Sequence, residues 1–196
     1  MIGDAHAVGT TPLDPDEAAA LLPRHIATQG QLNEWEQANI LAAVQWAAAA
    51  RTKVDLLTDT FVRELHRRMF DRTWRWAGRY RQSDKNIGIA WAQVPMRVRD
   101  LLADTRFWVD HTTYPSVEIA VRLHHRLVAT HPFPNGNGRH ARLMADLVLT
   151  NLGGSQLPWG RNDLTQESEI RARYIDALNR ADAGDIAPLL AFAQGG

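Results

Sequence analysis

Apolar residues recur at helical spacing along most of the chain. Phe61, Leu65 and Met69, for example, follow one another every four residues, as on the buried face of a helix. No internal repeat and no long polar linker divides the pattern, so we expect one domain. Together with capping residues and glycine or proline stops, the pattern predicts helices over residues 14–23, 33–50, 57–70, 94–112, 115–130, 137–152, 164–182 and 185–194. We therefore expect an all-α fold of about eight helices.

Polar residues refine the boundaries of two of these helices. Asn33 is the expected N-cap of the second helix, and Thr58 or Asp59 opens the third. Within the third helix, the charged run over residues 63–68 is typical of a solvated helix face.

The helical pattern stops between residues 73 and 96. Aromatic and β-branched residues there surround a group of turn-forming residues, which is typical of a short hairpin or an extended flap. The residues of this expected flap are Asp84, Lys85, Asn86, Ile87 and Gly88. It is the one β element that the pattern predicts.

A second interruption, "HPFPNGNGRHAR", starts at His131. Pro132 disfavours the α conformation for the residue before it, so the preceding helix should end there. Gly136 and Gly138 allow positive φ and close approach of another group to the backbone. The apolar pattern resumes from Asn137, which places glycine-rich amides at a helix N-terminus. Such an end, with the positive pole of the helix dipole, favours an anion.

Charged side chains near this turn support the same interpretation. Arg139 and Arg142 are three residues apart, so we expect them to share a helix face and point toward the same opening. Two guanidinium groups beside such amides suit a polyphosphate, because each can bind oxygens in a fork. His131 is expected at a helix C-terminus, which favours the imidazolium and predicts titration near neutral pH. Such a base can accept a proton from a hydroxyl that attacks phosphorus.

Composition restricts the classes of function. The chain has 196 residues, with 22 Lys and Arg against 22 Asp and Glu, and its formal net charge is zero. This argues against wholesale binding of nucleic acid or of a membrane surface. The absence of cysteine excludes disulfides and thiolate nucleophiles. No apolar run has the length of a membrane span and no signal pattern opens the chain, so we expect a cytoplasmic protein with a flexible segment over residues 1–12.

The central turn resembles the signature of the Fic-domain family, His-Pro-Phe-x-(Asp/Glu)-Gly-Asn-Gly-Arg-x-x-Arg, at every fixed position except one. Residues 76–81, "WAGRYR", and the closing residues 174–192 resemble the same family, so that the likeness covers about residues 55–192. "QLNEWEQANI" and "KNIG" are similar to the subgroup called mobile mystery protein B. The resemblance implies the Fic fold, with a core over residues 55–194 and N-terminal helices over residues 13–54 that we expect to be regulatory.

The resemblance also implies an activity, adenylyl transfer. AMP would move from ATP to a Ser, Thr or Tyr hydroxyl of a target protein, with His131 as the general base. By the same resemblance, Gly136, Asn137 and Gly138 cradle the α- and β-phosphates.

The remaining site residues are assigned by the resemblance in the same way. Arg139 would hold the β- and γ-phosphates and orient the leaving pyrophosphate, and Arg142 would reach the γ-phosphate. The flap would bind an extended segment of the target by strand addition. Tyr174 or Asn179 would line the adenine pocket.

Asn135 is the one departure from the signature. The family usually has Asp or Glu at this position to hold Mg²⁺ on the phosphates, and an amide oxygen brings no charge to the metal. Weaker Mg²⁺ binding leaves two alternatives beside AMP transfer: a scaffold that binds nucleotide or a partner without turnover, and phosphoryl transfer as in the related Doc proteins. Doc proteins typically have lysine where Gly138 stands, so the glycine favours AMP transfer.

Regulation is the last expectation. Many Fic proteins are restrained by a glutamate that pairs with the second arginine of the signature, and Glu36 is the candidate here, with Arg142 as its expected partner. No strict match to the inhibitory motif occurs, which leaves room for an inhibitor chain. The mobile mystery group is found with a small helix-turn-helix companion, so we expect a pairing similar to that of a toxin with its antitoxin.

Overall fold

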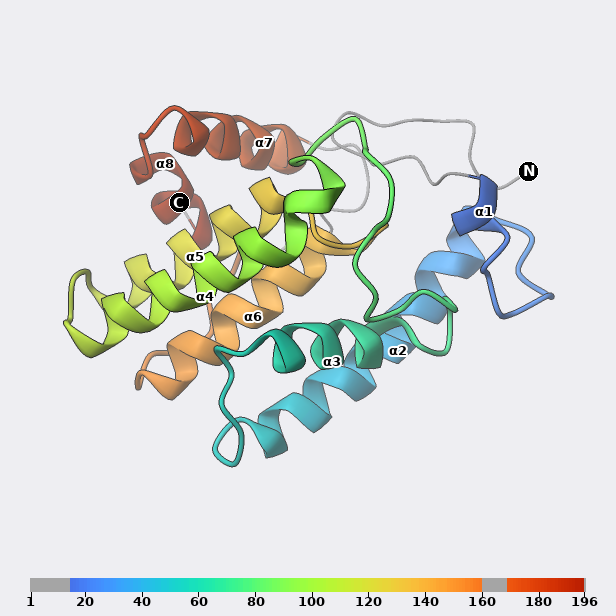
Figure 1. Ribbon diagram of the computed structural model, residues 1–196, viewed down its shortest axis with the longest axis horizontal. Helices are drawn as coiled ribbons and strands as arrows, with labels where there is room; N and C mark the ends of the chain where they lie inside the picture. The colour runs from blue at the N-terminus through green and yellow to red at the C-terminus, as the bar shows by residue number, and fades with distance from the viewer. Residues whose placement is uncertain (1–14, 160–168, 196) are drawn as a thin grey trace.

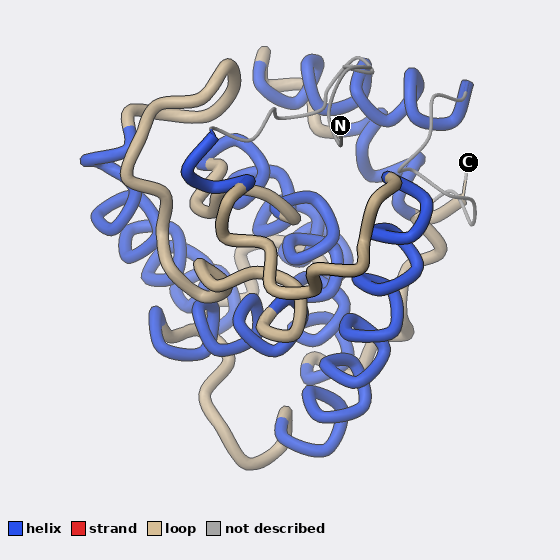
Figure 2. The backbone as a smooth tube through the Cα atoms, turned by 90° about the vertical axis from the view of Figure 1, so that its right-hand side faces the viewer, coloured by secondary structure: helices blue, strands red, loops and turns tan. Residues whose placement is uncertain are grey.

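The structure is a computed structural model that describes residues 15–159 and 169–195. Over these residues it contains α-helices and one short 3-10 helix but no β-strand, as the tube in Figure 2 shows. The helices are α1 (Pro15–Ala18), α2 (Gln29–Ala50), α3 (Asp59–Phe70), η1 (Trp91–Gln93), α4 (Val94–Asp110), α5 (Ser116–Thr130), α6 (Asn137–Asn151), α7 (Glu169–Asp182) and α8 (Ala187–Ala193). The prediction of an all-α fold with about eight helices is confirmed. The expected flexible segment, and the start of the helix predicted over 164–182, lie outside the described residues.

The helices form one arrangement around the central pair α5 and α6. Helix α6 contacts α5 as well as α2 and α3, whereas α7 and α8 pack against each other and against α5. Figure 1 shows the α2–α3 pair and the α7–α8 pair on opposite sides of this central pair. Residues of α2 on one side and of α7 on the other reach the start of α6, directly after the turn between α5 and α6.

Two apolar clusters hold the helices together. The larger cluster joins α2, α3, α4, α5 and α6 and contains fully buried Leu65, Leu123 and Met144. The smaller cluster joins α7 and α8 to Val121 of α5 and Leu149 of α6. No helix of the described part of the chain is both long enough and apolar enough to cross a membrane.

Capping explains where α2 and α3 begin. The predicted start of α2 at Asn33 is wrong, because Thr28 caps the helix. The Thr28 hydroxyl accepts from the Gln31 amide at 3.2 Å, and the Gln31 side chain accepts from the Thr28 amide at 3.2 Å. This reciprocal pair is a capping box. The prediction for α3 is confirmed, since the Thr58 hydroxyl accepts from the Phe61 amide at 3.2 Å.

Candidate active site

The conformation of the polar turn follows from its prolines and glycines. Helix α5 ends at Thr130, as the proline at position 132 predicts, and His131 adopts the left-handed conformation with φ 52° and ψ 61°. Gly136 is also left-handed, with φ 76°, and it caps the start of α6. A Cβ atom at Gly136 would lie 2.5 Å from the ring of Phe70, so only glycine fits between the turn and α3.

Asn137 closes the turn with its side chain. Its Oδ1 accepts from the Phe133 amide at 2.9 Å, and its Nδ2 donates to the Phe133 carbonyl at 2.8 Å. The main chain at the start of α6 then follows helical geometry, with the His140 amide donating to the Gly136 carbonyl at 2.9 Å. The amides before His140 have no acceptor within the helix, which is the geometry of the predicted anion site.

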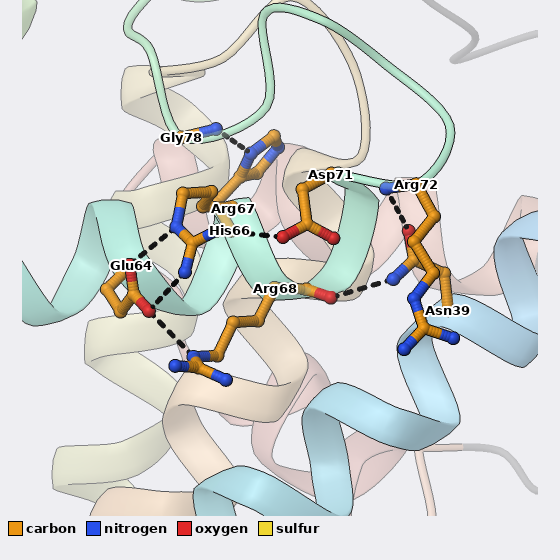
Figure 3. A network of polar contacts seen from close by, with 8 residues as sticks. All are labelled: Asn39, Glu64, His66, Arg67, Arg68, Asp71, Arg72 and Gly78. Atoms are coloured by element: carbon orange, nitrogen blue, oxygen red, sulfur yellow. Dashed lines mark hydrogen bonds and ion pairs between the residues drawn. The ribbon is translucent and has the colours of Figure 1, made fainter. Parts of the chain in front are cut away.

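His66 of α3 contacts the turn through Asn135 and Phe133. The sequence did not single it out. Its Nδ1 accepts from the Gly78 amide at 3.0 Å (Figure 3), so Nε2 carries the proton and donates to the Asn135 carbonyl at 3.0 Å. The ring stacks on Phe133 with centroids 3.7 Å apart. Burial lowers the pKa of His66 well below its ordinary value, which keeps the ring neutral in this tautomer.

The predicted solvated face over residues 63–68 is therefore wrong in part. Leu65 and His66 are fully buried, while Glu64 pairs with Arg67 and Arg68 on the outer side of α3 (Figure 3). The apolar spacing that places Leu65 in the core was the signal for His66, since the two residues are neighbours on the inward side of one helix.

His131 is buried, and its environment corrects the predicted titration. Burial, together with the positive charges of Arg81 and Lys85, lowers the pKa of the imidazole to about 4. The expectation that the helix C-terminus favours the imidazolium is wrong, because desolvation and two cations oppose the dipole. The imidazole is neutral at pH 7, which is the state that accepts a proton.

The segment expected to form the flap lies directly over His131. The predicted hairpin is not found, because residues 82–90 form bends without a strand. Gly88 has φ 94°, and a Cβ atom there would lie 2.6 Å from the Cβ of His131. Nearby, Asp84 Oδ1 accepts from the Trp91 amide at 2.8 Å, and Lys85 Nζ forms an ion pair with Glu17 of α1 at 2.5 Å. Ile87 and Asn86 are exposed beside them.

Arg139 lies on the α2 side of the turn, in contact with Glu36. Its Nη1 donates to Oε2 of Glu36 at 2.7 Å, while Oε1 of the same carboxylate accepts from Nε1 of Trp74 at 2.6 Å. Glu36 is 4% exposed. The expectation that Glu36 pairs with Arg142 is wrong, because α2 passes beside the first turn of α6 on the side of Arg139.

Asn39, one helical turn after Glu36, fixes α2 in this place. Its Nδ2 donates to the Arg68 carbonyl at 2.9 Å, and its Oδ1 accepts from the Arg72 amide at 3.1 Å, as Figure 3 shows. The amide side chain thus bonds the two main-chain groups at the end of α3. Because Asn39 and Glu36 lie on the same face of α2, this contact holds the carboxylate opposite Arg139.

Arg142 lies on the opposite side of the turn, toward α7. Its guanidinium carbon is 5.7 Å from the ring centroid of Tyr174, and its Nη1 is 3.6 Å from the position of a Cβ on Gly138. The Tyr174 hydroxyl lies 3.0 Å from Nε2 of His124, a fully buried histidine of α5. Burial, followed by the charges of Arg142 and of the adjacent His125, lowers the pKa of His124 well below its ordinary value. Arg139 and Arg142 therefore diverge, one toward α2 and the other toward α7, and the expectation that both point toward the same opening is wrong.

Asn135 does not form a metal site in this arrangement. Its Oδ1 accepts from the Gly136 amide at 2.5 Å, and its carbonyl accepts from His66. Within residues 15–159 and 169–195, no group of three or more His, Asp or Glu side chains is placed to hold a metal ion. The residues present do not fit a magnesium site made by the protein alone, and binding of Mg²⁺ by Asn135 stays a prediction.

Comparisons with known proteins identify the family of the chain. The family model described as "Fic/DOC family" matches residues 56–149, which include α3 to α5, the whole turn and most of α6. A probable protein adenylyltransferase, y4lH of Sinorhizobium fredii, is 30% identical over 181 residues, which are 85% of this chain and 85% of that protein. The chain belongs to the Fic/DOC family.

Other relatives are longer than this Fic protein. Protein adenylyltransferase fic-1 of Caenorhabditis briggsae is 32% identical over 119 residues, which are 59% of this chain and 22% of the relative. The chain thus spans about a fifth of the length of that relative.

Solved structures share the fold at low identity. A Fic domain containing signaling protein from Bacteroides thetaiotaomicron has a TM-score of 0.64 and 23% identity, over 83% of this chain and 66% of that one. BepC of Bartonella tribocorum, with bound AMPPNP, has a TM-score of 0.67 and 15% identity, over 92% of this chain and 97% of that one. These likenesses show the Fic fold.

Proposed function

We propose that this Fic protein transfers AMP from ATP to a Ser, Thr or Tyr hydroxyl of another protein. The observation that carries the proposal is a buried, neutral imidazole, His131, beside the amides that open α6. Relatives named protein adenylyltransferase support the same reaction.

In the proposed step, the imidazole of His131 accepts the proton of the acceptor hydroxyl. The hydroxyl oxygen attacks the α-phosphorus, the bond from that phosphorus to the bridging oxygen of the β-phosphate breaks, and pyrophosphate leaves with the electron pair. In this proposal the main-chain amides of Asn137 and Gly138 face the phosphate oxygens, since the Asn137 side chain is already bonded to Phe133. The Gly136 amide joins them only when it exchanges its bond to Oδ1 of Asn135 for a phosphate oxygen.

The two arginines have separate tasks in this proposal. Arg139 binds the β- and γ-phosphates and the leaving pyrophosphate, and Arg142 binds the γ-phosphate. The adenine lies toward Tyr174, whose ring faces Arg142. An extended segment of the target binds along the loop over residues 84–88, which lies against His131.

Labelled nucleotides test the proposal. Purified protein is incubated with Mg²⁺, a cell lysate and ATP that is labelled on either the α- or the γ-phosphate. Label on protein from the α-phosphate alone is expected. Label from the γ-phosphate alone would indicate phosphoryl transfer, and none from either would leave a binding scaffold. His131→Ala should abolish labelling, whereas His111→Ala, at an exposed histidine on another face, should leave it unchanged.

We further propose that the Glu36–Arg139 ion pair restrains the reaction. With Nη1 of Arg139 bonded to the carboxylate at 2.7 Å, the guanidinium is oriented toward α2. A nucleotide that binds Arg139 through its phosphates has to displace Glu36, since both ligands are anions that compete for one fork of donors. The expected helix-turn-helix companion is a separate means of restraint and stays a prediction.

Mg²⁺ enters this proposal with the nucleotide, as a charge shared by the phosphates and water. Asn135→Asp offers a carboxylate at the same position and is expected to raise the transfer rate and the apparent affinity for Mg²⁺. The measurement is the rate of labelling against Mg²⁺ concentration. An unchanged dependence of the rate on Mg²⁺ concentration would mean that residue 135 does not contact the metal.

A further inference from the structure

We infer that Arg81 is a positioning residue that joins the loop over residues 82–90 and the turn at His131 into one rigid unit. The inference rests on the proposed function, because the unit matters through the acceptor hydroxyl that it places beside the imidazole. Arg81 ends the "WAGRYR" stretch and contributes no group to the phosphate site.

The guanidinium of Arg81 is bonded to both parts. Its Nε donates to the His131 carbonyl at 2.7 Å, and its Nη1 donates to the Ser83 carbonyl at 2.8 Å. Its Nη2 donates to the Ile89 carbonyl at the far end of the loop. The Arg81 main-chain amide adds a bond to the Pro132 carbonyl at 3.0 Å. One residue therefore binds both ends of the loop and two consecutive carbonyls of the turn.

Burial makes these bonds specific to arginine. The Arg81 side chain is 0% exposed, and the nearest carboxylate oxygen, on 68% exposed Asp84, is 3.7 Å from its Nη1. Main-chain carbonyls thus provide most of the solvation of this charge. A planar guanidinium presents donors in three directions at once, whereas a lysine ammonium on a flexible chain cannot reach three carbonyls that are arranged around a fork.

The loop and the turn are in close contact at Gly88 and His131. A Cβ atom on Gly88 would lie 2.6 Å from the Cβ of His131, 3.2 Å from Nη2 of Arg81 and 3.2 Å from the carbonyl of Thr130. Gly88 thus fits against the histidine only because it lacks a side chain. His131 in turn has an uncommon left-handed backbone, and its carbonyl is bonded to Arg81.

Such a unit replaces the strand pairing that the loop lacks. A target segment bound along residues 82–90 would be held at a fixed distance from the imidazole, so the hydroxyl would approach in one orientation. If the loop shifts relative to His131, transfer should slow, since a small misplacement of the hydroxyl lowers the rate by a large factor. Nucleotide binding should be unaffected, because the amides of Asn137 and Gly138 and both arginines belong to α6.

Arg81→Lys tests the inference, with Arg79→Lys as the matched control at an exposed position in the same segment. Hydrogen exchange of the amides over residues 82–90 should be faster by about tenfold in Arg81→Lys and unchanged in the control. Labelling from α-labelled ATP should fall by about 100-fold, while the Kd for ATP stays that of the wild type.

A second variant keeps the test decisive if Arg81→Lys does not fold. Gly88→Ala retains Arg81 and should displace the loop, with the same faster exchange and the same loss of labelling, while Gly30→Ala in α2 meets only the Thr28 hydroxyl at 3.9 Å and serves as its control. Wild-type exchange over 82–90 in Gly88→Ala and in a folded Arg81→Lys would overturn the inference, as would a loss of ATP affinity as large as the loss of labelling. Hydrogen exchange and ATP affinity can be measured without turnover. A wild-type protein that never transfers label would therefore contradict the proposed function and leave the inference about Arg81 intact.

Discussion

The two sides of the first turn of α6 each hold one arginine, but the groups that contact the two arginines differ. On the α2 side, Arg139 is bonded to a buried carboxylate that is itself held by an indole N–H. On the α7 side, Arg142 faces the ring of Tyr174, and the buried group behind that ring is a neutral histidine, His124. Within residues 15–159 and 169–195, Arg139 is thus paired with a carboxylate at 2.7 Å, whereas Arg142 forms no such ion pair. The restraint that we propose therefore concerns only the Arg139 side of the candidate active site.

Acidification should have the largest effect on the free energy of unfolding. On the α7 side, this effect comes from protonation of buried His124, which contacts Tyr174. Burial lowers the pKa of four histidines below the ordinary 6.5, namely His66, His124, His131 and His140. Between pH 6.5 and about 4 the unfolded chain binds more protons than the folded protein, so stability falls as the pH falls through this window. His140, with its pKa lowered to about 4, accounts for about 3 kcal/mol by itself.

Urea unfolding at several pH values between 7 and 4.5 measures this loss. His124→Gln removes one titrating ring and should flatten the dependence of the unfolding free energy on pH, whereas His111→Gln at an exposed position should not. An equal slope in wild type and His124→Gln would contradict a neutral His124.

Arg139→Met should lower the free energy of unfolding by about 3 kcal/mol, because it leaves the buried carboxylate of Glu36 without its cation. Arg142→Met removes a cation that faces an aromatic ring and should cost about 1 kcal/mol or less. The double variant Glu36→Gln/Arg139→Met should recover most of the loss. A double-mutant cycle by chemical denaturation checks both statements, and additive effects of the two substitutions would contradict the pairing.

Glu36→Gln should raise the rate of labelling from α-labelled ATP by about 10- to 100-fold, the range expected when one charged hydrogen bond no longer competes with the phosphates. Glu34→Gln, at an exposed position on the same helix, is the matched control. If both variants label at the wild-type rate, Glu36 does not restrain the reaction.

Tyr174→Phe should have a small effect, a loss of about 1 kcal/mol of stability and thus no larger than that of the other substitutions on the α7 side, because it removes the bond to His124 and keeps the ring under Arg142. Labelling should stay close to the wild-type rate. A loss as large as that of Arg139→Met would mean that the α7 side depends on this hydroxyl as much as the α2 side depends on Glu36.

The turn was predictable because its features are local. Pro132 ends α5 and Gly136 caps α6, whereas the spacing of the two arginines predicted one shared direction and the side chains diverge. The partner of Arg139 was not predictable, since it depends on how α2 crosses α6. The sequence alone does not distinguish a contact of Glu36 with Arg139 from one with Arg142. His66 was missed for a similar reason, because its two bonds reach Gly78 and Asn135, residues far away in the chain.

The titration of His131 and the form of the flap show a second limit. A helix C-terminus favours a charged ring, but burial beside Arg81 and Lys85 outweighs that local effect. Aromatic and β-branched residues around Gly88 favour a hairpin, but bonds from Arg81 to Ser83 and Ile89 take the carbonyls that a strand partner would need. In both cases long-range contacts override a local preference.

Glu36 and Arg139 belong to one polypeptide, which has a consequence for how the proposed restraint responds to the cell. Dilution cannot separate the two groups, since each sees the other at a fixed effective concentration set by the packing of α2. The fraction of molecules released would then follow the level of the competing nucleotide and not the abundance of the protein itself.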